Sequence, residues 1–251
     1  MWIKPLLFSV LFTVFMSAGH TQNLELGVQG GVMYYLGDLN PNRQFLMSNP
    51  AYGILGRLNL NDRFAFRVHY LRGEIQGDDT VSGFLLSRGL SFSSKITEIA
   101  TVMEFNFFDY FTGSKINYFS PYLVLGPCVY LHNPHIDAVE FMVNQPEPDY
   151  KASPVDLALI LGFGFKYSLT EKLGITAEWV MRKAFSDYLD GVSKKYGNSN
   201  FTFGDPTNSH VAGMQRGNSQ SNDWYSFAGI TLTYRFNLTQ KTTCSGFEYS
   251  Q

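Results

Sequence analysis

Long segments in which apolar and polar residues alternate are the feature that most constrains the fold of this chain. In residues 155–167 every odd-numbered position is Val, Leu, Phe or Tyr, whereas Asp156 and Lys166 stand between them. Residues 224–236 alternate in the same way. A repeat of two is that of a β-strand, whose successive side chains point to opposite faces. We identify eight such segments, which begin near Leu24, Ala51, Phe64, Ser94, Ser120, Val155, Leu173 and Trp224.

The connections between these segments alternate between two lengths. The short or moderate ones are residues 61–63, 109–119 and 168–172. The long, polar ones are residues 36–50, 74–93, 132–154 and 184–223. An up-and-down membrane barrel with short periplasmic turns and long outer loops requires this order. A soluble β-sandwich has the same periodicity but no reason to sort its loops by side. We therefore predict an all-β fold, an eight-stranded antiparallel up-and-down transmembrane β-barrel.

The two faces of the predicted strands differ in a way that fits this fold. A membrane barrel turns its apolar face toward lipid and its polar face inward. Five acids, five permanent cations and one histidine would then lie in an interior just wide enough to be filled by side chains. Because an unpaired buried charge is prohibitive, we expect a paired network and no aqueous pore. The predicted network comprises Glu25, Arg57, Arg67, His69, Glu98, Glu104, Asp156, Lys166, Glu178, Arg182 and Arg235.

Composition excludes several other classes. Only 16% of the residues are charged, yet the mean hydropathy is −0.09, far below that of a helical membrane protein. An aromatic content of 16% is incompatible with a disordered chain. Lys plus Arg number 19 against 21 Asp plus Glu, a net charge of −2. The chain therefore has no basic footprint for nucleic acid, and we expect no nucleic-acid partner.

The N-terminus has the pattern of a secretory signal. Lys4 is followed by the apolar run 5–15 and then by the small residues 17–19. The run is shorter than the roughly 20 residues that a membrane-spanning helix needs. We predict a signal peptide over residues 1–21, an outer-membrane barrel over residues 22–236, and a periplasmic C-terminal tail over residues 237–251. The long loops are then extracellular.

No arrangement of residues indicates catalysis or a cofactor. His69 lies on a predicted inward face near Glu98, but the chain has no Gly-x-Ser-x-Gly motif. A single interior histidine is more often a hydrogen-bonded filler than a catalyst. Acidic residues in the outer loops do not follow the spacing of a calcium loop. These are Asp38, Asp78, Asp79, Asp187 and Asp190. We expect no enzyme activity, no cofactor and no metal.

Several segments resemble one family of outer-membrane barrels. The matching segments are residues 31–41 (GVMYYLGDLNP), 56–67 (GRLNLNDRFAFR), 88–108 (RGLSFSSKITEIATVMEFNFF), 121–127 (PYLVLGP), 132–134 (HNP) and 163–196, which contains FSDYLDGVS. Together they resemble the PorG-like barrels of Bacteroidetes, over roughly residues 24–236. The resemblance implies a part in the type IX secretion system, which exports proteins and in some members supports gliding. It also implies association with a periplasmic ring built from a lipoprotein and its partner, without an enzymatic activity or a cofactor.

The two cysteines bear on this implied partner. Cys128 lies in mid-strand, whereas Cys244 lies in the tail, so a filled barrel keeps the two thiols apart. An unpaired periplasmic cysteine suggests an intermolecular disulfide. One hypothesis is therefore that Cys244 tethers the barrel to the ring lipoprotein. The other is that it is an incidental thiol.

Two functions remain open from the sequence. In the first, the barrel anchors or positions the periplasmic lipoprotein ring at the outer membrane. In the second, it is a stand-alone surface barrel that binds lipid, envelope or host ligands through its long outer loops. The tail favours the first function, and the loops favour the second. Outer-membrane lipid surrounds the barrel in both.

Overall fold

A computed structural model describes residues 23–83, 90–138, 155–186, 189 and 223–237. The predicted signal peptide, nearly all of the predicted tail with Cys244, and the loop residues Asp187 and Asp190 lie outside this part. The strands are β1 (Asn23–Leu36), β2 (Asn49–Asn59), β3 (Phe64–Asp78), β4 (Leu90–Asn106), β5 (Phe119–Leu131), β6 (Pro134–Ala138), β7 (Val155–Ser168), β8 (Leu173–Ala184) and β9 (Trp224–Asn237). One short helix, α2 (Asp79–Ser82), follows β3.

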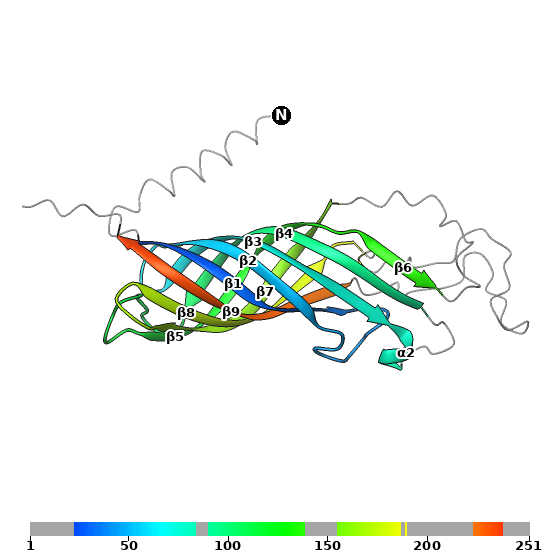
Figure 1. The fold of residues 1–251 in the computed structure, drawn as a ribbon. Helices are drawn as coiled ribbons and strands as arrows, with labels where there is room; N and C mark the ends of the chain where they lie inside the picture. Colours follow the sequence, from blue (N-terminus) through cyan, green and yellow to red (C-terminus); the bar gives the residue numbers. More distant parts are fainter. Residues whose placement is uncertain (1–22, 84–89, 139–154, 187–188, 190–222, 238–251) are drawn as a thin grey trace, which may run out of the picture.

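The strands form a closed barrel (Figure 1). Its wall runs in the order β3-β2-β1-β9-β8-β7-β5-β4, and pairing between β3 and β4 closes it. Every pairing is antiparallel, and consecutive wall strands are neighbours. Closure leaves no exposed sheet edge around the eight-stranded wall, so each strand satisfies its backbone groups on both sides. The predicted eight-stranded barrel is confirmed.

The ninth strand and two longer strands depart from the prediction. Strand β6 lies in the segment predicted as loop 132–154, where it pairs with residues 90–94 of β4 beyond the end of β5. Strand β3 continues to Asp78, and strand β4 begins at Leu90. Both strands therefore extend into the segment predicted as loop 74–93. Many of these residues are Ser, Gly or Gln, which hide an alternation that the inward side chains Ile75 and Phe92 maintain.

The two ends of the barrel differ. The short connections 60–63, 107–118 and 169–172 lie at the end where β1 begins and β9 finishes, which we call the turn end. The opposite end, where α2 and β6 lie, is the loop end (Figure 1).

The outer wall is apolar. On β7 every odd-numbered side chain from Val155 to Tyr167 points outward and is exposed, Leu161 by 54%. Ile230 on β9 is 57% exposed. In a soluble protein apolar side chains are buried and charged ones are exposed, and this barrel has the opposite distribution. That distribution is the architecture of an outer-membrane β-barrel. In the part of the chain that the structure describes, no helix is long and apolar enough to cross a membrane.

The interior is filled, but only part of it is polar. Toward the turn end it contains buried ionised side chains. Toward the loop end it contains buried apolar side chains, among them Met33, Tyr35, Leu39, Leu71, Ile75, Phe92, Ile96, Tyr225 and Phe227. The prediction of a filled interior is confirmed, and the charged side chains are concentrated in its turn-end half, whereas apolar side chains lie beside buried polar ones in the loop-end half.

Candidate functional site

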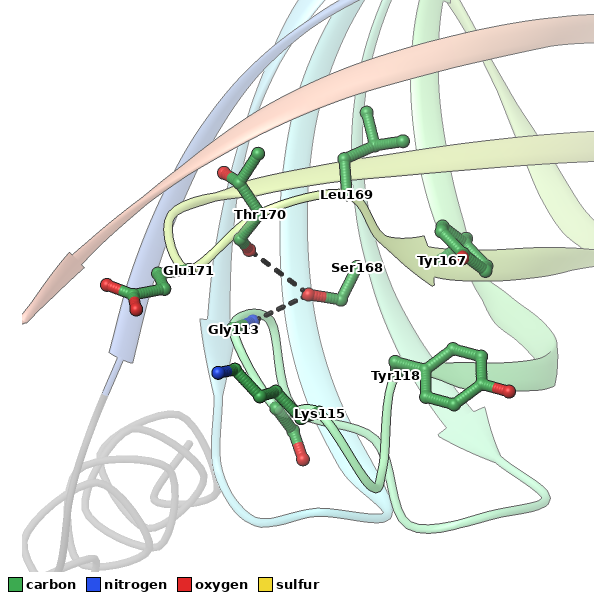
Figure 2. A pocket seen from close by; sticks show the side chains of 9 residues that line it. Gly113, Lys115, Tyr118, Tyr167, Ser168, Leu169, Thr170 and Glu171 are labelled. Carbon is green, nitrogen blue, oxygen red and sulfur yellow. Dashed lines mark hydrogen bonds between the residues drawn. The ribbon is translucent and has the colours of Figure 1, made fainter.

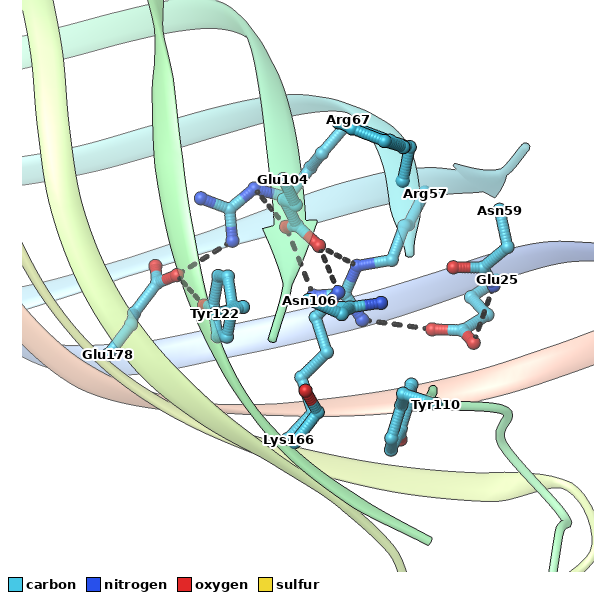
Figure 3. Close-up of polar contacts among 12 residues, drawn as sticks. Glu25, Arg57, Asn59, Arg67, Glu104, Asn106, Tyr110, Tyr122, Lys166 and Glu178 are labelled. Atoms are coloured by element: carbon cyan, nitrogen blue, oxygen red, sulfur yellow. Dashed lines mark hydrogen bonds and ion pairs between the residues drawn. The ribbon is translucent and has the colours of Figure 1, made fainter. Parts of the chain in front are cut away.

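Glu104 on β4 is the centre of the turn-end half of the interior (Figure 3). Its carboxylate lies 2.8 Å from Arg57 Nε, 3.2 Å from Arg67 Nε and 2.6 Å from Lys166 Nζ. Arg57 Nη2 also donates a hydrogen bond of 3.3 Å to Glu104. All four side chains are at most 1% exposed. One acid from β4 therefore joins cations from β2, β3 and β7 across the barrel.

Two further acids complete this cluster. Arg57 Nη1 lies 2.9 Å from Glu25 on β1, and Arg67 Nη1 lies 2.7 Å from Glu178 on β8. Tyr122 donates a 2.7 Å hydrogen bond to the same Glu178 oxygen. Three acids therefore face three cations, which makes the cluster neutral. We call it the lower cluster, and its charged members are Glu25, Arg57, Arg67, Glu104, Lys166 and Glu178.

A second cluster surrounds Glu98, further toward the loop end on β4. Arg182 from β8 binds its carboxylate at 2.7 Å, and His69 Nε2 from β3 lies 3.1 Å away. Tyr225 donates a hydrogen bond of 2.8 Å to the other oxygen of Glu98. The buried Cys128 thiol lies 3.8 Å from the Tyr225 hydroxyl. We call this group the upper cluster. His69 therefore contacts a carboxylate, that of Glu98, which Arg182 and Tyr225 also bind.

Two residues of the predicted network lie apart from both clusters. Asp156 is near the loop end, where it contacts His132 Nε2 at 2.9 Å and accepts a 2.7 Å hydrogen bond from Ser186. The Arg235 guanidinium lies 4.4 Å from the centre of the Phe111 ring at the turn end. Within the described residues, Arg235 has no ion-pair partner.

A folded connection closes the turn end of the barrel. We call residues 107–118, between β4 and β5, the turn-end cap. Thr112 inserts into the interior and donates a 2.7 Å hydrogen bond to Glu25. Tyr110 is also buried, and its hydroxyl lies 3.2 Å from the Thr112 hydroxyl. Burial raises the pKa of Tyr110 to about 12, so this phenol stays neutral at physiological pH.

Contacts with the two other turns fix the cap in place. Arg63 forms an ion pair with Asp109 and donates to the Phe107 carbonyl. The Gly113 amide donates a 2.7 Å hydrogen bond to Ser168 Oγ. Gly113 has a φ of +99°, and a Cβ there would lie 2.3 Å from a backbone oxygen in the 169–172 turn. Only glycine fits this close approach.

Comparison with known protein families assigns the chain to one of them. Residues 4–245 match a family described as a domain of unknown function, DUF6089. The chain belongs to the DUF6089 family. No curated protein matches this DUF6089 chain.

Solved structures with likeness to this DUF6089 member are small outer-membrane proteins. Neisserial surface protein A is 10% identical, with a TM-score of 0.47, and the match covers 85% of this chain and 97% of that one. Ail, the attachment invasion locus protein of Yersinia pestis, is 8% identical, with a TM-score of 0.45 and coverages of 86% and 100%. OprG of Pseudomonas aeruginosa is 13% identical, with a TM-score of 0.43 and coverages of 88% and 99%. The strand pairing, which closes between β3 and β4, itself establishes the barrel.

The outer surface of the cap in this DUF6089 member exposes apolar side chains. Ile116 is 86% exposed, on a tight turn in which Ser114 Oγ accepts hydrogen bonds from the amides of Ile116 and Asn117. Beside it lies a shallow cleft of about 540 Å³ between the cap and the 169–172 turn (Figure 2). Tyr118, Tyr167, Lys115, Leu169 and Glu171 contribute to its lining. The arrangement offers a contact surface.

Two of the loop acids, Asp78 and Asp79, lie at the short helix α2. Asp78 caps α2, because its carboxylate accepts hydrogen bonds from the amides of Thr80 and Val81. Asp79 is buried in the first turn of the same helix. In the described ranges, no group of three or more His, Cys, Asp or Glu residues could hold a metal ion.

Sequence reasoning missed several polar partners. Tyr122 and Tyr225 follow the inward alternation of their strands, so the same periodicity that located the charges could have located them. Thr112 and Tyr110 lie in a connection without periodicity, and no local signal shows that it folds inward.

Proposed function

We propose that this chain is a non-catalytic outer-membrane component of the type IX protein secretion machinery, which anchors or positions a periplasmic lipoprotein ring. The single observation that carries the anchoring role is the filled interior. Side chains fill the interior, and they come from the two clusters, the apolar loop-end core and the turn-end cap. The barrel is therefore suited to holding a position in the membrane. The assignment to this machinery is supported by the resemblance of residues 31–41, 88–108 and 163–196 to PorG-like barrels.

The orientation that we propose places the turn end in the periplasm. Bacterial barrels have short periplasmic turns and longer outer loops, and both chain ends then lie on the periplasmic side. The turn end combines the ordered cap, the exposed Ile116 and the beginning of the segment 238–251. Cys244 in that segment is the proposed covalent tether to the lipoprotein. One cation, Lys115, and one acid, Glu171, line the cleft beside the rings of Tyr118 and Tyr167, which suits a protein partner.

The proposed role requires no catalysis. His69 is a candidate base by residue type, but its Glu98 partner also binds Arg182 and Tyr225 in a buried cluster between the apolar and charged halves of the interior. These contacts support a structural role for the histidine.

Purification from the native outer membrane tests the proposal. A tagged full-length chain is isolated without reductant, and co-purifying proteins are identified by mass spectrometry. We expect a periplasmic lipoprotein, which is lost when residues 238–251 are deleted. With Cys244→Ser the covalent adduct disappears from non-reducing gels, whereas the adjacent control Ser245→Ala retains it. A strain without the chain should also accumulate secretion substrates in the periplasm.

Other results would reject parts of this proposal. Recovery of the folded barrel alone, together with normal secretion in the strain without the chain, rejects the secretion role. An adduct that persists in Cys244→Ser, or one that is missing from wild type while the lipoprotein still co-purifies, rejects only the covalent tether.

The second candidate function is a surface barrel that binds envelope or host ligands at the loop end. The ordered helix α2 and strand β6 beyond the wall favour it, because they provide a defined surface there. In that case the 238–251 deletion has no effect on secretion, whereas replacement of residues 79–82 by a glycine-serine linker abolishes ligand binding.

A further inference from the structure

The charges on the outer face of β3 and β4 have an uneven distribution. From the turn end, the outward positions of β3 are apolar or aromatic from Phe64 to Tyr70, and the next outward residue is Arg72. On β4 the outward positions from Phe105 to Thr97 carry no charge, and the next is Lys95. On both strands, therefore, the first charge beyond the lipid-facing surface is a cation.

These two cations are close neighbours on the barrel surface. Arg72 is opposite Thr97 in the β3–β4 register, and Lys95 is opposite Glu74. Arg72 and Lys95 are thus diagonal neighbours, which lie about 7–8 Å apart at the backbone in an antiparallel sheet. Both side chains are exposed and long enough to reach a common ligand.

Within the described part of the chain, no acid neutralises either cation. Arg72 and Lys95 form no ion pair with any residue that the structure describes. Glu74, the nearest acid in the register, accepts a 3.2 Å hydrogen bond from Gln76 on its own strand. The patch thus has two positive charges against one negative charge, and it attracts anions.

The surface next to these cations determines what kind of anion fits. Tyr52 on β2 is opposite Arg72 in the register and is 63% exposed. Ile54, one step toward the turn end, is opposite Tyr70, and Ile99 on β4 is 58% exposed. This apolar surface is continuous with the lipid-facing wall. A ligand that covers the whole patch therefore needs acyl chains against Tyr70 and Ile99 and an anionic group at the height of the cations.

We propose that Arg72 and Lys95 form a binding site for the phosphate group of a membrane lipid, at the loop-end border of the β2–β4 wall. The Arg72 guanidinium binds two phosphate oxygens through its planar fork, and the Lys95 ammonium binds as a point charge. The Thr97 hydroxyl stands between them in the register. This site rests on the membrane-spanning wall alone and not on the secretion role.

Two classes of lipid carry the required group, a phosphorylated glycolipid and an anionic glycerophospholipid. In the proposed orientation the loop-end leaflet is the outer one, which favours the glycolipid. The probes are therefore diphosphorylated lipid A, phosphatidylglycerol and zwitterionic phosphatidylcholine.

Native mass spectrometry of the full-length chain in detergent micelles measures the site. The probes are added singly to wild type, to Arg72→Gln/Lys95→Gln and to the control Lys115→Gln/Lys172→Gln, which removes the same charge at the turn end. We expect the first double variant to bind lipid A at least tenfold more weakly, while the control binds as wild type does. Binding of phosphatidylcholine should be the same in all three proteins.

The remaining outcomes are decisive. A tenfold loss for both lipid A and phosphatidylglycerol supports the site and identifies a general phosphate site, whereas a loss for lipid A alone identifies a glycolipid site. An equal loss in both double variants, or no loss in a variant that still shows the gel shift of a folded barrel, overturns the proposal. If Arg72→Gln/Lys95→Gln does not fold, the variants Arg72→Lys and Lys95→Arg, which keep the charges, are measured instead. They show whether folding failed because charge was lost or because packing changed.

Discussion

Thr112, in the cap between β4 and β5, donates a 2.7 Å hydrogen bond to Glu25 on β1, 87 residues earlier in the chain. Both side chains are fully buried. The same carboxylate binds Arg57 and accepts a hydrogen bond from Asn59. A connection outside the wall therefore completes the coordination of an acid inside it, and the cap and the lower cluster form one buried unit.

Removal of the Thr112 hydroxyl should loosen the turn end. Thr112→Val keeps the shape of the side chain but leaves Glu25 with one hydrogen bond fewer in a buried site. We expect a loss of about 1–3 kcal/mol in the free energy of unfolding. Urea unfolding in micelles, followed by gel mobility, measures it. Thr112→Ser should be close to wild type, and so should Thr101→Val on the exposed outer wall. A Val variant as stable as wild type would show that the cap is held by other contacts.

Neutralisation of Glu104 should have a larger effect. Glu104→Gln leaves three buried cations against two acids, and breaking a buried pair costs about 3–5 kcal/mol. The additional change Lys166→Met restores two cations against two acids, so the double variant should regain part of the loss. Glu171→Gln, in the 169–172 turn, is the control and should be neutral. If the double variant is less stable than Glu104→Gln, charge balance is not what stabilises the lower cluster.

A cation on the outer wall tests the position of the membrane. Leu161, in the middle of β7, faces outward, and Leu161→Arg should cost about 2–4 kcal/mol, as arginine does at the midplane of a bilayer. The same change at Ile116, on the cap, should cost far less. Refolding into phosphatidylcholine vesicles compares the two. Equal costs would place the β7 surface outside the lipid.

The filled interior predicts that the barrel does not conduct ions. The full chain, reconstituted in a planar bilayer, should give no steady ohmic current. A stable conductance step in wild type would contradict the filled interior. Replacement of cap residues 109–114 by a short glycine-serine turn is also expected to be non-conducting, because the apolar core still fills the loop end.

The buried phenol in the cap predicts a response to alkaline pH. The pKa of Tyr110 is raised by burial to about 12, whereas an unfolded tyrosine titrates near about 10. The neutral phenol therefore stabilises the fold fully below the unfolded pKa, and this contribution is lost as the pH rises toward 12. Absorbance titration at 295 nm should show one late-ionising tyrosine fewer in Tyr110→Phe than in wild type. A difference curve centred near 10 would mean that Tyr110 is exposed.

Much of the barrel was predictable because the alternating direction of side chains along a strand is a local property. The repeat of two places Glu104, Lys166 and Glu178 on inward faces wherever the strands lie in space, and all three are inward and buried. The order of short and long connections likewise gave the eight strands of the wall and their antiparallel course. Where the repeat is masked by Ser, Gly and Gln, as at the ends of β3 and β4, the predicted boundaries were wrong.

The sequence by itself determined which side chains of the wall strands point inward and which face lipid, because alternation depends only on neighbouring residues. Only the tertiary structure decided that Glu104 joins three cations, that Asp156 and Arg235 stand apart, and that Thr112 reaches Glu25. Those contacts depend on register and closure, and a shift of one residue between two strands would change every partner across the barrel. The inward fold of the cap likewise depends on Gly113 and Ser168 meeting across two turns, which no local pattern encodes.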